Sequence, residues 1–167
     1  MKIYTREYHG KKISTIWRPE SNSIKLVTQA TGICFNEEGK ILIINDGKKW
    51  HLPGGHPKGN ETLVETVTRE VKEEACVEVD HCILAGFSEI FFLENPNTQE
   101  GDHFYQARLV CKVSNLLEIC EDTATGITFE RKFIDPSEFL EYINWPDAKE
   151  LLNSCLKIFK ESSIFKK

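Results

Sequence analysis

The chain has no surplus of positive charge. Its 167 residues include 21 Lys and Arg against 26 Asp and Glu, which gives a formal net charge of −5. A protein that binds a nucleic-acid backbone through a basic patch needs the opposite balance, so we do not expect a nucleic-acid polymer as a partner. The charge suits small phosphorylated ligands only where cations stand between protein and phosphate.

Long apolar runs are also missing, and no stretch approaches the roughly 20 residues that cross a membrane. Residues 1–6 do not form a signal-peptide pattern. The six cysteines are scattered without a Cys-x-x-Cys pair, which suits a reducing cytoplasm better than a zinc site or a disulfide scaffold. We therefore expect a cytoplasmic protein with no membrane partner. The length is typical of one domain over residues 1–167.

What the sequence does contain is a dense acidic cluster. Glu70, Glu73 and Glu74 are spaced i, i+3 and i+4, so a helix places them on one face. Like charges at this spacing repel one another and destabilise a bare helix. A hard divalent cation such as Mg²⁺, which prefers oxygen ligands, would remove that repulsion. The cluster thus predicts a metal site.

The helix that carries the cluster follows from its own residues. Thr62 and Glu65, three positions later, form a capping-box pattern, so the helix is expected to start near Thr62. Aliphatic residues then recur every three or four positions as one apolar stripe, namely Val64, Val67, Val71 and Ala75. An isolated acidic run is more often a solvated helix face than a site, so the surrounding sequence has to decide.

The wider arrangement favours a site. Residues 55–77 contain a glycine, five residues, Glu61, seven residues and then Arg-Glu-Val-x-Glu-Glu, which resembles the Nudix box of the Nudix (MutT-type) hydrolases. The positions in register are Gly55, Glu61, Arg69, Glu70, Val71, Glu73, Glu74 and Val77. Cys76 stands where the family has its second glycine. A left-handed residue closes the helix there, so cysteine is expected to cost about 1 kcal/mol if that conformation is kept.

The resemblance implies a fold of the α/β (α+β) class, a Nudix-type α/β/α sandwich in which the box helix packs against a mixed β-sheet. The pattern of β-formers and turns is compatible with this. Strand patterns cover residues 2–8, 13–17, 24–35, 40–45, 82–93, 103–113 and 127–134. Besides the box helix, helical patterns cover residues 136–142 and 147–160.

The resemblance also implies an enzyme. Nudix hydrolases cleave a nucleoside diphosphate linked to another moiety, with Mg²⁺ as cofactor (Mn²⁺ as an alternative) and water attacking phosphorus. The implied metal ligands are Glu70, Glu73, Glu74 and the carbonyl oxygen of Gly54. The implied catalytic residues are Glu73, Glu70, Arg69 and Glu130.

Within that implied set, Arg69 would orient a box glutamate, and Glu61 would support the loop or a second metal shell. The general base stays open between a box carboxylate and a downstream one. Our downstream candidate is Glu130, which precedes an aromatic strand residue by three positions, ahead of Glu118 and Glu121. His51 and His56 beside the loop are weaker candidates for phosphate contact.

The substrate is the least determined property. The sequence motifs typical of ADP-ribose, NADH and coenzyme A hydrolases are missing, which favours nucleoside triphosphates, including oxidised ones, as substrates. ADP-ribose and dinucleoside polyphosphates stay open as alternative substrates. A homodimer also stays open. Candidates for stacking on a base are Trp50, Phe91, Phe92 and Tyr105. Two other classes remain: a non-catalytic nucleotide-binding module, and an isopentenyl diphosphate isomerase. The isomerase would need Cys34 as a catalytic residue, yet Cys34 lies in a core strand pattern.

Overall fold

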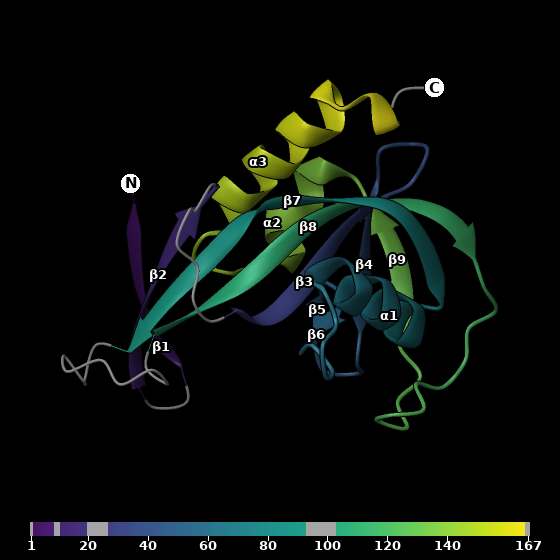
Figure 1. Ribbon diagram of the computed structural model, residues 1–167, viewed down its shortest axis with the longest axis horizontal. Helices are drawn as coiled ribbons and strands as arrows, with labels where there is room; N and C mark the ends of the chain where they lie inside the picture. Colours follow the sequence, from purple (N-terminus) through teal and green to yellow (C-terminus); the bar gives the residue numbers. More distant parts are fainter. Residues whose placement is uncertain (1, 9–10, 20–26, 93–102, 166–167) are drawn as a thin grey trace.

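The strands pair into one mixed sheet in the computed structural model, which describes residues 2–8, 11–19, 27–92 and 103–165 (Figure 1). The strand order is β1-β2-β7-β8-β3-β4-β5, with β6 paired to β3 and β9 paired to β4. β3 and β8 run parallel, and the other described pairs are antiparallel. The strands are β1 Ile3–Tyr8, β2 Lys11–Arg18, β3 Val27–Phe35, β4 Ile41–Asn45, β5 Trp50–His51, β6 Gly54–Gly55, β7 Val77–Phe92, β8 His103–Leu116 and β9 Glu130–Ile134.

Helices cover both faces of this sheet (Figure 1). The box helix α1 (Leu63–Ala75) packs on one face, and α3 (Ala148–Glu161) packs on the other. Shorter elements accompany α3, namely η1 Pro136–Glu138, α2 Phe139–Tyr142 and η2 Ser163–Phe165. No helix in these described ranges is long and apolar enough to cross a membrane.

The two-residue period of β4 explains why both faces are apolar. Leu42 and Ile44 point into the cluster under α1, whereas Ile41 and Ile43 point into the cluster under α3. All four side chains are fully buried. A strand that is apolar on both sides needs cover on both sides, and this confirms the predicted α/β/α arrangement.

The start of α1 is where the sequence placed it. Thr62 accepts from the backbone N–H of Glu65 at 3.2 Å, and the Glu65 carboxylate accepts from the N–H of Thr62 at 2.8 Å. The predicted stripe is wrong at its first position, because Val64 is 44% exposed. Thr66 is buried instead, and its hydroxyl donates to the Thr62 carbonyl at 3.0 Å, which satisfies its polar atom inside the helix.

Several strand boundaries differ from the sequence prediction. β7 begins at Val77 rather than 82, because α1 ends at Ala75, Cys76 caps it, and the chain then pairs at once with β8. β9 begins at Glu130 rather than 127, and the two-residue strands β5 and β6 were not predicted. Residues 24–26, part of the predicted 24–35 strand, and residue 93, the end of the predicted 82–93 strand, lie outside the described residues.

Cys82 and Cys111 form a disulfide between the neighbouring strands β7 and β8. The scattered spacing of the cysteines gave no indication of this pair, because the two residues become neighbours only when the strands align. Of the remaining cysteines, Cys34 and Cys155 are buried in the two core clusters. Cys34 lies in the core, as its strand pattern predicted.

Candidate active site

The loop before α1 brings two glycines against the helix. A Cβ atom on Gly54 would lie 2.5 Å from the carbonyl oxygen of Ala30, and one on Gly55 would collide with the carboxylate of Glu70. Gly54 therefore requires a residue without a side chain, because its neighbour is the backbone of β3, whereas a side chain at position 55 would displace the mobile carboxylate end of Glu70. The N–H of Gly54 donates to Oε2 of Glu74 at 2.9 Å, which ties the loop to the last turn of α1.

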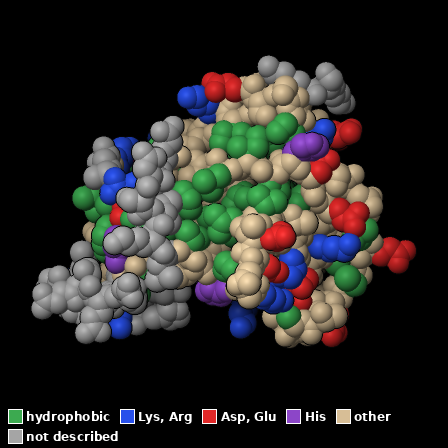
Figure 2. Space-filling model, viewed as in Figure 1, with side chains coloured by type: hydrophobic (Ala, Val, Ile, Leu, Met, Phe, Trp, Pro, Cys, Tyr) green, Lys and Arg blue, Asp and Glu red, His purple; other side chains and the backbone are tan. Residues whose placement is uncertain are grey.

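Arg69 is the centre of an ion-pair network on this edge of α1. Its guanidinium donates to both oxygens of Glu61, from Nε at 2.7 Å and from Nη2 at 2.9 Å. Nη1 donates to Glu70 at 2.7 Å and to Glu73 at 2.9 Å, and Nη2 also donates to the His56 carbonyl at 3.1 Å. These five residues hold the loop and helix in one geometry, and charged side chains gather over α1 in Figure 2.

The pKa values of Glu61 and Glu74 are shifted in opposite directions. Hydrogen bonds from Arg69 lower the pKa of Glu61 to about 2, and those bonds in turn raise the pKa of Arg69. Burial raises the pKa of Glu74 to about 7, in spite of the opposing hydrogen bond from Gly54. The negative charges of Glu70, Asp122 and Glu73 add to that rise. A cation beside Glu74 would therefore favour its charged form.

We call the set Glu61, Arg69, Glu70, Glu73 and Glu74 the acidic edge. Arg69 donates hydrogen bonds to three of its carboxylates, whereas the Glu74 carboxylate accepts one from the N–H of Gly54. Within residues 2–8, 11–19, 27–92 and 103–165, no three acidic, His or Cys side chains are arranged around a common metal position. The predicted ligands therefore share one edge of α1 without converging on a point.

The downstream candidates lie apart from this network. Glu130 is exposed at the first position of β9, opposite Asn45 of β4. Among the described residues it forms no hydrogen bond with the acidic edge. Glu118 and Glu121 are also exposed.

Asp122 was missed by the sequence reasoning. It is only 4% exposed, and its carboxylate accepts from the Ala124 N–H at 2.9 Å and from the Thr125 hydroxyl at 2.5 Å. Its charge reaches Glu74, since it contributes to the raised pKa of that carboxyl. The Asp-Thr-Ala-Thr-Gly turn at 122–126 was the available signal, because an aspartate that closes a turn on its own backbone has a fixed position.

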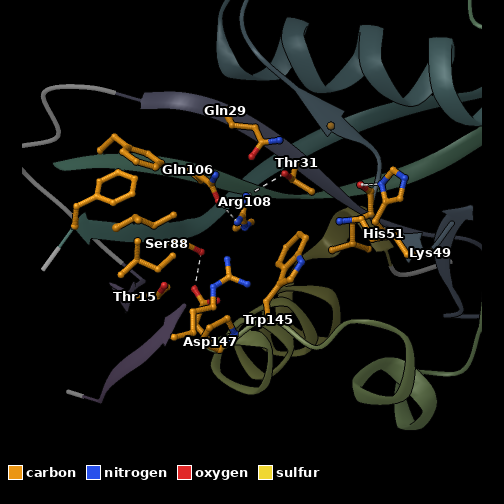
Figure 3. Close-up of a pocket in the computed structure, with 18 of the residues that line it drawn as sticks. Thr15, Gln29, Thr31, Lys49, His51, Ser88, Gln106, Arg108, Trp145 and Asp147 are labelled. Atoms are coloured by element: carbon orange, nitrogen blue, oxygen red, sulfur yellow. Dashed lines mark hydrogen bonds between the residues drawn. The ribbon is translucent and has the colours of Figure 1, made fainter. Parts of the chain in front are cut away.

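A cavity of about 380 Å³ opens between the sheet and the segment before α3 (Figure 3). Gly54 lines it, so the cavity adjoins the acidic edge. Its aromatic walls include Trp145 and Phe92, and its polar lining includes Arg108 and Asp147. The lining as a whole comes from the N-terminal strands, through Arg6, from the middle strands and from the segment before α3.

Arg108 forms the polar floor of this cavity. Its side chain is 3% exposed and donates from Nη1 to the Thr31 hydroxyl at 3.0 Å and from Nη2 to Gln106 at 2.7 Å (Figure 3). The guanidinium carbon lies 4.5 Å from the centre of the Trp145 ring, a cation–π distance. Burial lowers the pKa of Arg108 to about 10, so the group stays charged at neutral pH.

A carboxylate faces this cation across the cavity. Asp147 is 2% exposed and accepts from the Ser88 hydroxyl at 2.5 Å. Nε of Arg108 has no hydrogen-bond partner among the described residues. The cavity therefore offers a buried donor, a buried acceptor and an aromatic wall, a combination that suits a planar heterocyclic ligand.

Of the four residues that the sequence offered for stacking on a base, one lines the cavity and three do not. Phe92 lines the cavity, but Trp50 does not and instead packs edge-on against Tyr142. Phe91 stacks on His103, and Tyr105 donates to Glu89 at 2.7 Å. Trp145, which the sequence reasoning did not select, takes the wall position. Of the two loop histidines, His51 lines the cavity, and burial lowers its pKa.

A family model for the NUDIX domain matches residues 25–157. The chain belongs to the Nudix family. The matched region contains α1, the acidic edge and most of the cavity, and it covers most of the 167 residues. As a Nudix protein the chain is a hydrolase, as the box predicted.

Known relatives agree with this assignment. The mouse protein described as the 8-oxo-dGDP phosphatase NUDT18 is 42% identical over 48 residues, which are 26% of this chain and 15% of that protein. Among solved structures, a mutant of the Bacillus subtilis pyrophosphohydrolase BsRppH superposes with a TM-score of 0.67 at 17% identity and covers 99% of this chain and 100% of that chain. A NUDIX hydrolase from Nitrosomonas europaea gives 0.61 at 16% identity over 80% of this chain and 90% of that one. At these identities the structures share the fold.

Proposed function

We propose that this Nudix hydrolase cleaves a phosphoanhydride bond of a nucleotide in a Mg²⁺-dependent reaction, with nucleoside triphosphates as its first substrate class. One observation carries the proposal: Gly54 lines the cavity, and its N–H donates to Glu74 of the acidic edge. A nucleotide with its base beside Trp145 would therefore have its phosphates beside α1. The cavity would bind the base, and the adjoining acidic edge would bind the phosphates.

The donor set fits a hard divalent cation. Glu70, Glu73 and Glu74 supply carboxylate oxygens, and Mg²⁺ or Mn²⁺ prefers such ligands together with a carbonyl such as that of Gly54. Arg69 uses one oxygen of Glu70 and one of Glu73, and in the described part each keeps a second oxygen without a hydrogen bond. When bound, the cation would polarise a phosphate oxygen and lower the pKa of a bound water.

The remaining residues of the acidic edge would act by position. Arg69 would orient Glu70 and Glu73 and thus serve as a positioning residue, while Glu61 would hold Arg69. The proton of the attacking water would pass to a carboxylate. A box glutamate is the nearer candidate for that role, and Glu130 stays the downstream candidate, because it is exposed at the edge of β9.

The cavity would hold the nucleoside. Trp145 and Phe92 would stack on the base, with Arg108 donating to an acceptor on its edge and Asp147 accepting from a donor. The name of the mouse relative adds oxidised deoxyguanosine diphosphate to the candidates, although the aligned part is a quarter of this chain. ADP-ribose and dinucleoside polyphosphates are the alternatives. A cytoplasmic location and the exclusion of nucleic-acid polymers rest on composition.

The test is phosphate release, with a coupled pyrophosphatase or phosphatase, across nucleoside triphosphates, 8-oxo-dGTP, 8-oxo-dGDP, ADP-ribose and dinucleoside polyphosphates. Each is assayed with and without Mg²⁺. The wild type is compared with Glu73→Gln, which removes one charge from the acidic edge, and with Glu161→Gln, which removes one from the exposed end of α3.

We expect metal-dependent turnover of one class, loss of most of it in Glu73→Gln, and wild-type rates in Glu161→Gln. Full activity of Glu73→Gln would overturn the assignment of the acidic edge. Nucleotide binding without turnover of any compound would instead identify a binding module.

A further inference from the structure

Two thiols meet beside the end of α1. The sulfur atoms of Cys76 and Cys120 are 3.0 Å apart, and the N–H of Cys120 donates to the Cys76 sulfur at 3.2 Å. Cys76 is 2% exposed, whereas Cys120 is exposed to solvent. One thiol of the pair can therefore meet a dissolved reagent, and the other lies directly behind it.

The backbone of Cys76 is fixed from several sides. It closes α1 in the left-handed conformation, with φ 51° and ψ 47°. Its carbonyl accepts from the Leu117 N–H at 2.9 Å and from Nη1 of Arg131 at 2.7 Å. Because Leu117 belongs to the segment that carries Cys120, the contact that fixes one cysteine also positions the other.

We propose that Cys120 is a site of oxidative modification and that Cys76 completes the reaction as an intramolecular disulfide. A disulfide bond is about 2.05 Å long, so the sulfurs need to approach by roughly 1 Å. Cys76 stands where the Nudix box has glycine, so the inference concerns this chain and lies outside its hydrolytic function. It is independent of the metal site and of the substrate.

The reaction balances with a small disulfide such as oxidised glutathione as the oxidant. The Cys120 thiolate attacks one glutathione sulfur, which forms a mixed disulfide and releases the first glutathione thiolate. The Cys76 thiolate then attacks the Cys120 sulfur, forms the intramolecular bond and releases the second glutathione thiolate. The two protons from the protein thiols protonate the two released thiolates, and two glutathione molecules are the reduced product.

The hydrogen bond with Cys76 raises the pKa of the Cys120 thiol, and desolvation adds to the rise. Less thiolate is present at neutral pH, so the first step is slow there and faster at alkaline pH. The other cysteines give no equivalent pair, because Cys34 and Cys155 are buried and Cys82 is bonded to Cys111.

The disulfide would join α1 to the segment 117–129. Asp122 lies in that segment two residues beyond Cys120, and its charge reaches Glu74. The oxidised chain would thus hold this segment against the end of the helix that carries the acidic edge. Closing the loop between residues 76 and 120 would raise the free energy of unfolding, chiefly by restricting the conformations of the unfolded chain.

The experiment treats the full-length protein with oxidised glutathione at pH 8.5, blocks free thiols and digests with trypsin and a glutamate-specific protease. Cleavage at Glu78 separates Cys76 from Cys82, so the two disulfides give different linked peptides. We expect a peptide pair linking Cys76 to Cys120 and a rise of the melting temperature by roughly 5–10 °C. Cleavage by the glutamate-specific protease at the exposed Glu118 and Glu121 of the folded protein should slow by several-fold.

Cys120→Ser is the matched control, since it keeps every other cysteine. It should lose the linked peptide and the temperature shift, while the Cys82–Cys111 peptides persist. A glutathione adduct that remains on Cys120 beside a free Cys76 thiol would overturn the proposal. So would an unmodified Cys120 after complete consumption of an exposed reference thiol in the same tube.

Discussion

The backbone N–H of Gly54 and the carboxylate of Glu74, twenty residues apart in sequence, are joined by a hydrogen bond of 2.9 Å. This bond links the glycine turn to the last turn of α1. The positions of the Glu74 and Glu70 carboxylates, which lie against Gly54 and Gly55, therefore depend on the backbone of this loop. The close approach of Gly55 to Glu70 gives a way to test that dependence.

Gly55→Ala should lower kcat/KM by about 100-fold, because the added methyl group would push the Glu70 carboxylate out of its place. The fold should tolerate the change, since a carboxylate is the mobile end of its side chain. Asn60→Ala, in the same loop and exposed, is the control. Steady-state kinetics and thermal melting measure both properties, and an unchanged kcat/KM would show that Glu70 has no part in turnover.

Arg69→Lys should weaken the acidic edge even though the charge is kept. Lysine is a point charge and cannot donate to both oxygens of Glu61 while it also reaches Glu70 and Glu73. We expect a loss of about 1–2 kcal/mol in the free energy of unfolding and a clear loss of kcat. Lys72→Gln, on the solvent side of α1, should change neither. Urea titration measures the free energy of unfolding, and steady-state kinetics measures kcat. A lower free energy of unfolding with an unchanged kcat would show that Arg69 supports the local fold and has no part in turnover.

Glu61 should make the protein sensitive to acid. Its pKa is about 2 in the folded state against an ordinary value of 4.5, so the unfolded chain binds the proton more readily. The stability that this carboxylate contributes is present above pH 4.5 and is lost as the pH falls through about 2. Urea midpoints between pH 5 and pH 2.5 should fall less steeply in Glu61→Gln than in the wild type. Equal slopes would mean that the ion pair with Arg69 is also present in the unfolded chain.

Trp145→Ala should raise KM for the nucleotide by roughly 10-fold or more, since stacking on a base contributes about 1–3 kcal/mol. The inhibition constant of tripolyphosphate, which has no base, should stay unchanged because the acidic edge is intact. Trp145→Phe should recover part of the loss, and Trp50→Phe, outside the cavity, should have no effect on KM. A uniform loss of tripolyphosphate and nucleotide binding would place the role of Trp145 in folding instead.

Cys76→Gly should leave the free energy of unfolding within about 1 kcal/mol of the wild type under reducing conditions. Glycine adopts the left-handed conformation at φ 51° without steric cost, and this gain offsets the lost burial of the thiol. The acidic edge keeps all its carboxylates, so turnover should persist. Denaturant unfolding measures the change; a loss beyond about 3 kcal/mol would show that the helix end relies on the Cys76 side chain.

The loop and helix of the acidic edge could be predicted because their information is local. Thr62 and Glu65 cap each other across three residues, and the glutamates share a face by helical period alone. The predicted stripe was wrong at Val64, in the first turn of α1, where the side chain is 44% exposed. The sandwich was implied by the resemblance to the Nudix family, and the order of the predicted strands and helices was compatible with it.

The cavity could not be predicted in the same way. Arg108 lies inside a strand, and its neighbours Thr31, Trp145 and Asp147 are distant in sequence. Only the register of β3 with β8 brings Thr31 beside Arg108. The Cys82–Cys111 pair depends on strand alignment as well. Asp122 was missed because its turn is remote from the box and becomes its neighbour only through tertiary folding.

The acidic edge and the cavity, which meet at Gly54, differ in where their residues lie in the sequence. The acidic edge comes from one short stretch, whereas the cavity walls are assembled from Arg6 near one end and Trp145 near the other. Under the proposed function, substitutions that alter substrate choice would fall at sequence positions remote from those that govern hydrolysis. Ancestors of this chain could thus have exchanged one nucleotide for another while their catalytic segment stayed the same.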